Sequence, residues 1–143
     1  MVPEITMTDA PDEEAKAFIL DPLSEFNEAC SGVRMNYQPL AIFLSDPETG
    51  EIVGGLWGES YLSYLFINLF FIPESMRGAG LGRRLMAQAE EEALRRGCRG
   101  VWLDTFSWQA RGFYEKLGYS VFGTIDDHPP GHQRFFLKKV IGV

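Results

Sequence analysis

The segment from Phe70 to Met86 combines the residue types that bind an anion at the start of a helix. It reads FFIPESMRGAGLGRRLM, in which an apolar stretch is followed by three glycines at alternate positions and then by a helix-forming sequence. Backbone N–H groups at a helix N-terminus carry about half a positive charge, and glycine lets that backbone approach a ligand. The segment therefore predicts a phosphate or pyrophosphate site, with tight packing of the turn as the structural alternative.

Two common phosphate-binding patterns do not fit this loop. A dinucleotide-binding fingerprint requires a glycine at the position of Arg83, and a P-loop requires Lys and then Ser or Thr after Gly82, where two arginines stand. The pattern R-x-x-G-x-G does fit, with Arg77, Gly80 and Gly82. It resembles the coenzyme A pyrophosphate loop of the GNAT superfamily of acyl-CoA-dependent N-acetyltransferases.

A second segment, Leu103 to Tyr119, is similar to the other signature of that superfamily. There a strand leads into a short helix that carries A-x-x-F-Y-x-x-x-G-Y/F, here Ala110, Phe113, Tyr114, Gly118 and Tyr119. The resemblance covers about residues 40–139 and implies one N-acetyltransferase domain over residues 1–143. Two features depart from the family pattern: Pro73 and Arg77 are one residue further apart than usual, and Ser107 stands where many members have Asn.

The resemblance implies a binding site for acetyl-CoA as the acyl donor. The backbone of the central strand would pair with the pantetheine arm, the loop would surround the pyrophosphate, and the second signature would hold the other side of the arm. The residues implied in these roles are Phe70, Phe71, Ile72, Arg77, Gly78, Ala79, Gly80, Leu81, Gly82, Arg83, Ser107, Ala110 and Phe113. The implied reaction is transfer of an acetyl group from acetyl-CoA to a primary amine.

Tyr114 is the predicted general acid of that reaction. A phenol with an ordinary pKa of about 10 is protonated at neutral pH and can donate its proton to the departing thiolate. A buried tyrosine that only packs is the alternative. The candidates for the base are Asp104 and Glu59, but a solvated or capping carboxylate is the favoured interpretation of each. A water chain, or simple diffusion of the neutral amine, would require no residue as the base. Among the tryptophans, we expect Trp108 to reach a ligand.

The elements that would position these residues can be read from the hydrophobic pattern. The expected strands cover residues 5–8, 40–44, 52–57, 64–72, 100–106, 120–125 and 134–140, and the expected helices cover an acidic segment interrupted at Pro22, residues 81–96 and residues 109–117. The strand at 64–72 shows little alternation, which predicts burial on both faces at the centre of the sheet. The fold class is α/β, with a central mixed, mostly antiparallel sheet flanked by helices on both faces.

Composition and charge limit the function classes. With 143 residues, 45% hydrophobic content and a net charge of −7, the chain is typical of one globular domain and poorly suited to nucleic-acid binding. The apolar run from Tyr61 to Pro73 is too short to cross a bilayer, no secretory signal is evident, and the two cysteines suit a reducing compartment, so we expect a cytoplasmic protein without membrane contact.

Charge is distributed unevenly along the sequence. Up to Met76 there are two cations and 13 acidic residues, and from Arg77 onward there are 11 cations and seven acidic residues. Two differently charged solvated faces would explain this step, and so would a phosphorylated donor at one end and a cationic acceptor at the other. We expect the acceptor to be a cationic small molecule or peptide amine.

The sequence also allows two other functions to be considered, a binding module without catalysis and a metal site. An acyl-CoA-binding sensor or partner-binding module without turnover would keep the loop and lack a working base. A metal site formed by His128, His132 and the neighbouring carboxylates Asp126 and Asp127 is disfavoured, because Pro129 and Pro130 prevent a helix from presenting both imidazoles on one face. The sequence predicts no metal and leaves a homodimer open.

Overall fold

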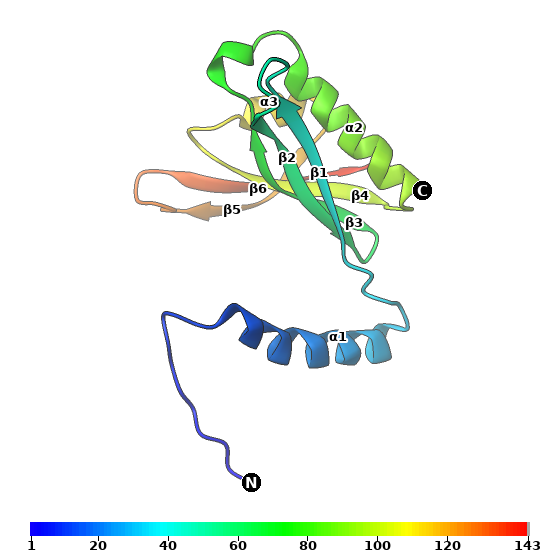
Figure 1. Ribbon diagram of the computed structural model, residues 1–143, viewed down its shortest axis with the longest axis vertical. Helices are drawn as coiled ribbons and strands as arrows, with labels where there is room; N and C mark the ends of the chain where they lie inside the picture. Colours follow the sequence, from blue (N-terminus) through cyan, green and yellow to red (C-terminus); the bar gives the residue numbers. More distant parts are fainter. Residues whose placement is uncertain (143) are drawn as a thin grey trace. The chain divides into compact units, whose positions relative to one another are not determined.

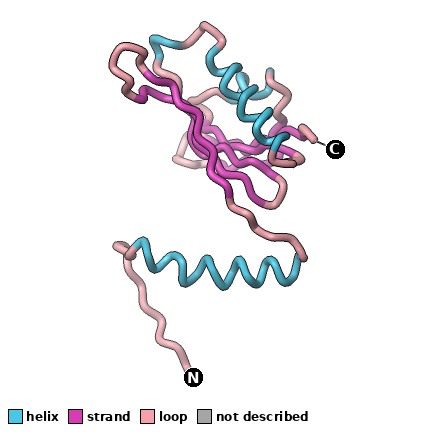
Figure 2. Tube along the Cα trace, turned by 45° about the vertical axis from the view of Figure 1, so that its right-hand side comes forward, coloured by secondary structure: helices cyan, strands magenta, loops and turns pink. Residues whose placement is uncertain are grey.

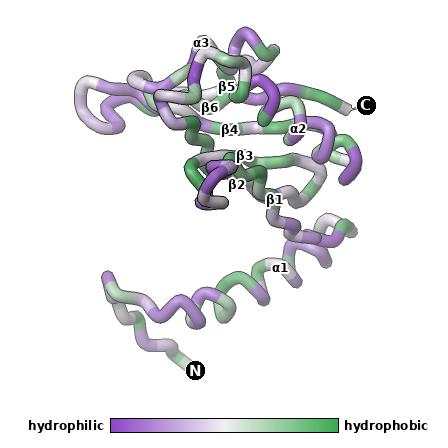
Figure 3. Tube along the Cα trace, turned by 45° about the horizontal axis from the view of Figure 1, so that its top comes forward, coloured by the Kyte–Doolittle hydropathy of each residue, from purple (hydrophilic) through white to green (hydrophobic). Residues whose placement is uncertain are grey.

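The computed structural model describes residues 1–142 and contains two compact units, Met1–Met35 and Asn36–Val143. The first unit consists of an extended segment, a short 3-10 helix η1 (Glu13–Lys16) and the helix α1 (Ala17–Ser31). Hydrophobic and hydrophilic residues are interspersed along α1 (Figure 3). Within the described residues, no helix is long and apolar enough to span a membrane. The single-domain prediction stays a prediction.

Two predictions for the first unit are wrong. Residues 5–8 form no strand, because a strand requires a partner for its backbone groups and no other strand pairs with this segment within the described residues. The helix α1 continues through Pro22, since a proline removes one N–H and the flanking backbone bonds keep the helical path. The helix ends at Gly32, which has φ +73° and donates its N–H to the Glu28 carbonyl oxygen at 2.9 Å.

The second unit is built on a six-stranded sheet (Figure 1). Its strands are β1 (Gln38–Ser45), β2 (Ile52–Tyr61), β3 (Tyr64–Phe71), β4 (Gly100–Phe106), β5 (Ser120–Asp126) and β6 (Gln133–Val140). The spatial order is β1-β2-β3-β4-β6-β5, and every neighbouring pair is antiparallel except β3 with β4. The central place of β3 is confirmed, and so is a mixed, mostly antiparallel sheet.

Burial alternates along the first half of β3. Leu65 and Ile67 are buried, whereas Tyr64 and Phe66 on the opposite face are only half-buried. The prediction that this strand is buried on both faces is therefore wrong, because the hydrophobic core lies on the face of Leu65 and Ile67. On the other face Phe66 is covered in part by the Trp102 ring, at 4.2 Å between ring centroids.

Two helices of the second unit pack on one face of this sheet. The helix α2 (Leu81–Arg95) presents Leu85, Met86, Ala89 and Ala93 at helical spacing to a core that includes Leu56, Leu65, Val101, Leu103 and Leu137. Figure 2 shows this helix as a coil running alongside the strands. The short helix α3 (Arg111–Lys116) adds Tyr114 to the same core and is shorter at both ends than predicted.

The C-terminal end of α2 is tied to the β1–β2 hairpin by Arg96. Its guanidinium donates to the carbonyl oxygens of Gln38 and Pro39 at 3.1 and 3.0 Å and to the Ser60 hydroxyl at 3.0 Å. The Glu92 carboxylate bonds both Arg95 and Arg96, and these hydrogen bonds lower its pKa to about 2. These bonds fix α2 along the sheet, and with it the loop at the other end of the helix.

Candidate active site

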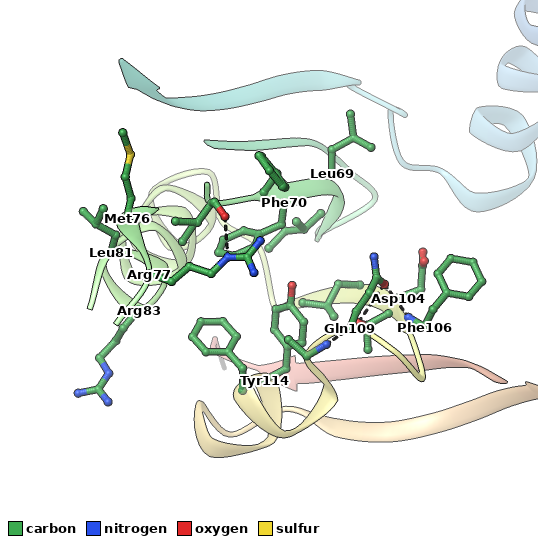
Figure 4. Close-up of a pocket in the computed structure, with 18 of the residues that line it drawn as sticks. Leu69, Phe70, Met76, Arg77, Leu81, Arg83, Asp104, Phe106, Gln109 and Tyr114 are labelled. Carbon is green, nitrogen blue, oxygen red and sulfur yellow. Dashed lines mark hydrogen bonds between the residues drawn. The ribbon is translucent and has the colours of Figure 1, made fainter. Parts of the chain in front are cut away.

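A cavity opens where the two parallel strands separate. β3 and β4 are paired only from Tyr64–Gly100 to Ile67–Leu103, and beyond this point β3 pairs with β2 alone. Asn68 is the extra residue of a bulge between β2 and β3, which turns the end of β3 away from β4. The resulting cavity has a volume of about 890 Å³ and lies between the end of β3, the β4–α3 segment and the start of α2 (Figure 4).

One end of the cavity is formed by the glycine-rich loop and the N-terminus of α2. Gly78 and Gly80 have φ angles of +86° and +79°, which favour glycine, and a Cβ at either position would meet no atom within 4 Å. The Arg84 N–H donates to the Gly80 carbonyl oxygen at 3.1 Å as the first helical bond, so the preceding N–H groups of the first turn have no helical acceptor. This open backbone can hold a pyrophosphate.

The two sequence motifs meet at Gly82. A Cβ on Gly82 would lie 3.0 Å from Phe113 Cζ and 3.2 Å from Ile72 Cδ1, so the absence of a side chain makes room for the Phe113 ring. Phe113 in turn lies near Phe70 and Tyr114, at 6.1 and 5.1 Å between ring centroids. The loop, the central strand and α3 therefore form one continuous wall of the cavity.

The two arginines of the loop are placed differently. Arg77 Nε donates to the Ile72 carbonyl oxygen at 2.8 Å, and its guanidinium lies 5.9 Å from the centroid of the Phe71 ring (Figure 4). Arg83 lines the cavity but extends away from Tyr114 in the same view. Arg77 thus contributes a fixed positive charge beside the end of β3, and Arg83 one at the start of α2.

Tyr114 lies in the wall of the cavity with its hydroxyl directed into it (Figure 4). The side chain is 7% exposed and packs edge-on against Phe70 at 6.2 Å. Burial, and secondarily the negative charge of Asp104, raises the pKa of Tyr114 to about 12. The phenol is therefore protonated at neutral pH, which is the state that a proton donor requires.

The raised pKa of Tyr114 predicts an alkaline loss of stability. In the unfolded chain this phenol titrates near its ordinary value of about 10, so its contribution is fully present below pH 10 and is lost as the pH rises toward 12. A difference of two pKa units corresponds to about 3 kcal/mol. We expect the free energy of unfolding in urea to fall more steeply between pH 9.5 and about 11.5 in the unaltered chain than in Tyr114→Phe. If the free energy of unfolding falls with pH equally in the two chains, the pKa of Tyr114 is not raised in the folded protein.

Asp104 lines the cavity near Tyr114 but is already paired. Its carboxylate accepts hydrogen bonds from Arg134 Nε at 3.0 Å and from a terminal guanidinium nitrogen at 2.9 Å. Both carboxylate oxygens are therefore engaged by one guanidinium, in the two-bond geometry typical of an arginine–carboxylate pair. Asp104 thus places a negative charge near the phenol, and its candidacy as the base stays a prediction.

The predicted site residues gather at this cavity with three exceptions. The lining includes Tyr114 and Asp104, the three strand residues Phe70, Phe71 and Ile72, the loop residues Arg77, Gly78, Gly80, Leu81, Gly82 and Arg83, and Ala110 and Phe113. Glu59 is an exposed residue of β2 outside the lining, and Ala79 and Ser107 do not line it either. The Ser107 hydroxyl is instead bonded to His132 and to the Gln133 N–H.

The sequence does not predict several of the residues that line the cavity. Asn68 enters the cavity only because of the bulge, and the sequence alone has no signal for that bulge. Gln109 also lines the cavity. Its side-chain oxygen Oε1 accepts hydrogen bonds from the Phe106 backbone N–H at 2.7 Å and from the Thr105 hydroxyl at 3.2 Å. Trp108, expected to reach a ligand, lies in the lining.

In residues 1–142 no group of three or more His, Cys, Asp or Glu side chains is arranged to hold a metal ion.

An open helix N-terminus after a glycine-rich loop, beside the separation of two parallel strands, suits a phosphorylated acyl donor. Residues 7–119 match the family described as acetyltransferase (GNAT) family, and the chain belongs to that family. Its members transfer an acetyl group from acetyl-CoA to amines, and this chain is an acyl-CoA-dependent N-acetyltransferase with acetyl-CoA as the donor.

Individual relatives agree with this assignment. The chain is 35% identical to an acetyltransferase of Agrobacterium fabrum over 133 residues, which cover 93% of this chain and 96% of the relative. It is 39% identical to the blasticidin-S acetyltransferase of Streptomyces morookaense over 108 residues, which cover 73% and 79%. A crystal structure of an acetyltransferase from Agrobacterium tumefaciens is similar with a TM-score of 0.88 and 34% identity, covering 96% of this chain and 99% of that one.

Proposed function

We propose that this chain acetylates the primary amine of a cationic small molecule or peptide, with Tyr114 as the general acid. The observation that carries the proposal is the buried Tyr114 hydroxyl directed into a cavity whose other end is an open helix N-terminus. We also propose that residues 1–143 act as one N-acetyltransferase domain, because the family match includes parts of both compact units.

The proposed reaction is a direct attack. The neutral amine nitrogen forms a bond to the thioester carbonyl carbon, the carbon–sulfur bond breaks, and the sulfur takes the proton of the Tyr114 hydroxyl. The acylated nitrogen then loses a proton, which returns the phenol to its protonated state through water. Water suits this step better than a side chain, because Asp104 is paired with Arg134 and Glu59 lies outside the cavity.

Charge near the first strands supports a cationic acceptor. Between Asn36 and Met76 there are five acidic residues and no Lys or Arg. The end of β5 and the turn that follows it add Asp126 and Asp127. Such a surface raises the local concentration of a cation. The relative named for acetylating blasticidin S supports a small-molecule acceptor.

An amine panel tests this proposal. With acetyl-CoA saturating, we expect release of the coenzyme A thiol with cationic amines, and we expect kcat/KM for the best amine to fall as ionic strength rises because the screening length is about 10 Å at 0.1 M salt. A neutral amine of similar size is the control and should show little salt dependence. Tight acetyl-CoA binding without thiol release for any amine would favour a binding module, and a preferred anionic amino acid would contradict the cationic acceptor.

A further inference from the structure

The end of the cavity away from the glycine-rich loop carries a pair of stacked aromatic rings. Phe106 and Trp108 both line the cavity, with their ring centroids 4.7 Å apart and their planes at 13°. His132 lies edge-on to Trp108 at 4.9 Å, and His128 lies edge-on to Phe106 at 5.3 Å. Trp108 nevertheless remains 55% exposed, so a large indole surface faces the solvent at the mouth of the site.

Backbone and side-chain bonds hold this pair in place. The Ser107 N–H donates to the Gln133 carbonyl oxygen at 2.8 Å, the Gln133 N–H donates to the Ser107 hydroxyl oxygen at 3.1 Å, and that hydroxyl shares a hydrogen bond with His132 Nδ1 at 3.1 Å. The β4–α3 loop is thereby fastened to the start of β6. An exposed tryptophan on such a frame loses little conformational freedom when it binds a ligand.

The same region already accommodates a planar cation against aromatic rings. The Arg134 guanidinium lies 5.5 Å from the centroid of the Phe106 ring and 5.0 Å from that of Phe136, while it is paired with Asp104. Arg134 and Asp104 neutralise each other, and Asp127 directly precedes His128, whose ring lies edge-on to Phe106. A carboxylate next in sequence to this aromatic cluster suits a second cation.

We propose that the Phe106–Trp108 pair recognises a planar cationic group, a guanidinium or amidinium, carried by the amine that is acetylated. A planar cation can lie flat on an indole and keep its N–H donors directed outward to carboxylates or water, which a tetrahedral ammonium cannot do equally well. Trp108 is then a specificity-determining residue of the acceptor site. This inference rests on the proposed function, since it assigns the acceptor of the same cavity.

The test compares two primary amines of similar length that differ in the distal cation. Agmatine carries a guanidinium and cadaverine an ammonium. With saturating acetyl-CoA, we expect kcat/KM for agmatine to exceed that for cadaverine by about tenfold. Trp108→Leu should remove most of this preference by lowering the value for agmatine about tenfold, whereas Trp108→Phe should retain part of it. Trp57→Leu is the matched control, because Trp57 is 48% exposed on β2 and does not line the cavity.

Equal kcat/KM values for the two amines, or a Trp108→Leu variant that lowers both equally, would overturn the inference and leave the proposed function intact. If no amine releases thiol, the proposed function fails, and calorimetric titration of agmatine into the protein with coenzyme A then decides. Agmatine binding that is weakened in Trp108→Leu and unchanged in Trp57→Leu supports the aromatic site. Absence of binding, or equal binding by all three chains, excludes it. Acetyl-CoA binding by each variant verifies that the cavity is folded.

Discussion

We expect Gly80→Asp to lower the affinity for acetyl-CoA by about 10²-fold or more while the chain remains folded. The residue precedes the first turn of α2, where a pyrophosphate would meet the open N–H groups, and an aspartate places a negative charge at that point. Folding is spared because no atom lies within 4 Å of the new Cβ. The φ of +79° costs a side chain about 1–2 kcal/mol, less for Asp and Asn than for most residues.

Gly80→Asn is the matched control for this prediction. It has the shape and the backbone strain of the aspartate without its charge, so the difference between the two variants in calorimetric titrations with acetyl-CoA isolates electrostatic repulsion. Gly82→Asp should abolish binding too, but its Cβ would lie 3.0 Å from Phe113, so its effect mixes packing with charge. If Gly80→Asp and Gly80→Asn bind acetyl-CoA equally well, the pyrophosphate does not lie at this loop.

The parts of the site that depend on local sequence were predictable. Glycines at 78 and 80 are required by left-handed backbone angles, and the apolar spacing of α2 fixes where its N-terminus begins. Tyr114 was found because Phe113 and Tyr114 occupy adjacent positions of a short motif on one helix. Each of these features is decided within about ten residues, the range over which chain geometry follows directly from residue type.

The remaining parts depend on residues that meet only in the folded chain. Asn68 and Asp104 are the polar residues that follow Ile67 and Leu103, but a single polar residue within a strand does not indicate that pairing with a neighbouring strand ends there. The sequence predicts Asp104 as a candidate base. It does not indicate the pairing of this carboxylate with Arg134, which lies 30 positions further along the chain. Ser107 was assigned to the cofactor by analogy, whereas its hydroxyl bonds residues of the β5–β6 turn and of β6. Long-range pairing of this kind leaves no local pattern.

The second large effect is expected for Tyr114→Phe, which should lower kcat by about 10²-fold or more and leave the acetyl-CoA dissociation constant nearly unchanged. The substitution removes one hydroxyl and keeps the ring that packs against Phe70 and Phe113. A proton given to the departing sulfur stabilises only the transition state, so its loss appears in kcat and not in ground-state binding. Steady-state kinetics at saturating acetyl-CoA and a separate calorimetric titration measure the two quantities.

Tyr119→Phe is the control for this last prediction, because Tyr119 lies edge-on to Tyr114 at 6.2 Å but donates its hydroxyl to Glu90 at 2.9 Å, outside the cavity lining. We expect that variant to lose stability and to keep its kcat. An unchanged kcat in Tyr114→Phe would remove Tyr114 as the acid and require the thiolate to leave unprotonated or to be protonated by water. A parallel loss of acetyl-CoA affinity would instead identify the phenol as part of the binding wall, with the ring cluster of Phe70, Phe113 and Tyr114 as the structure that it supports.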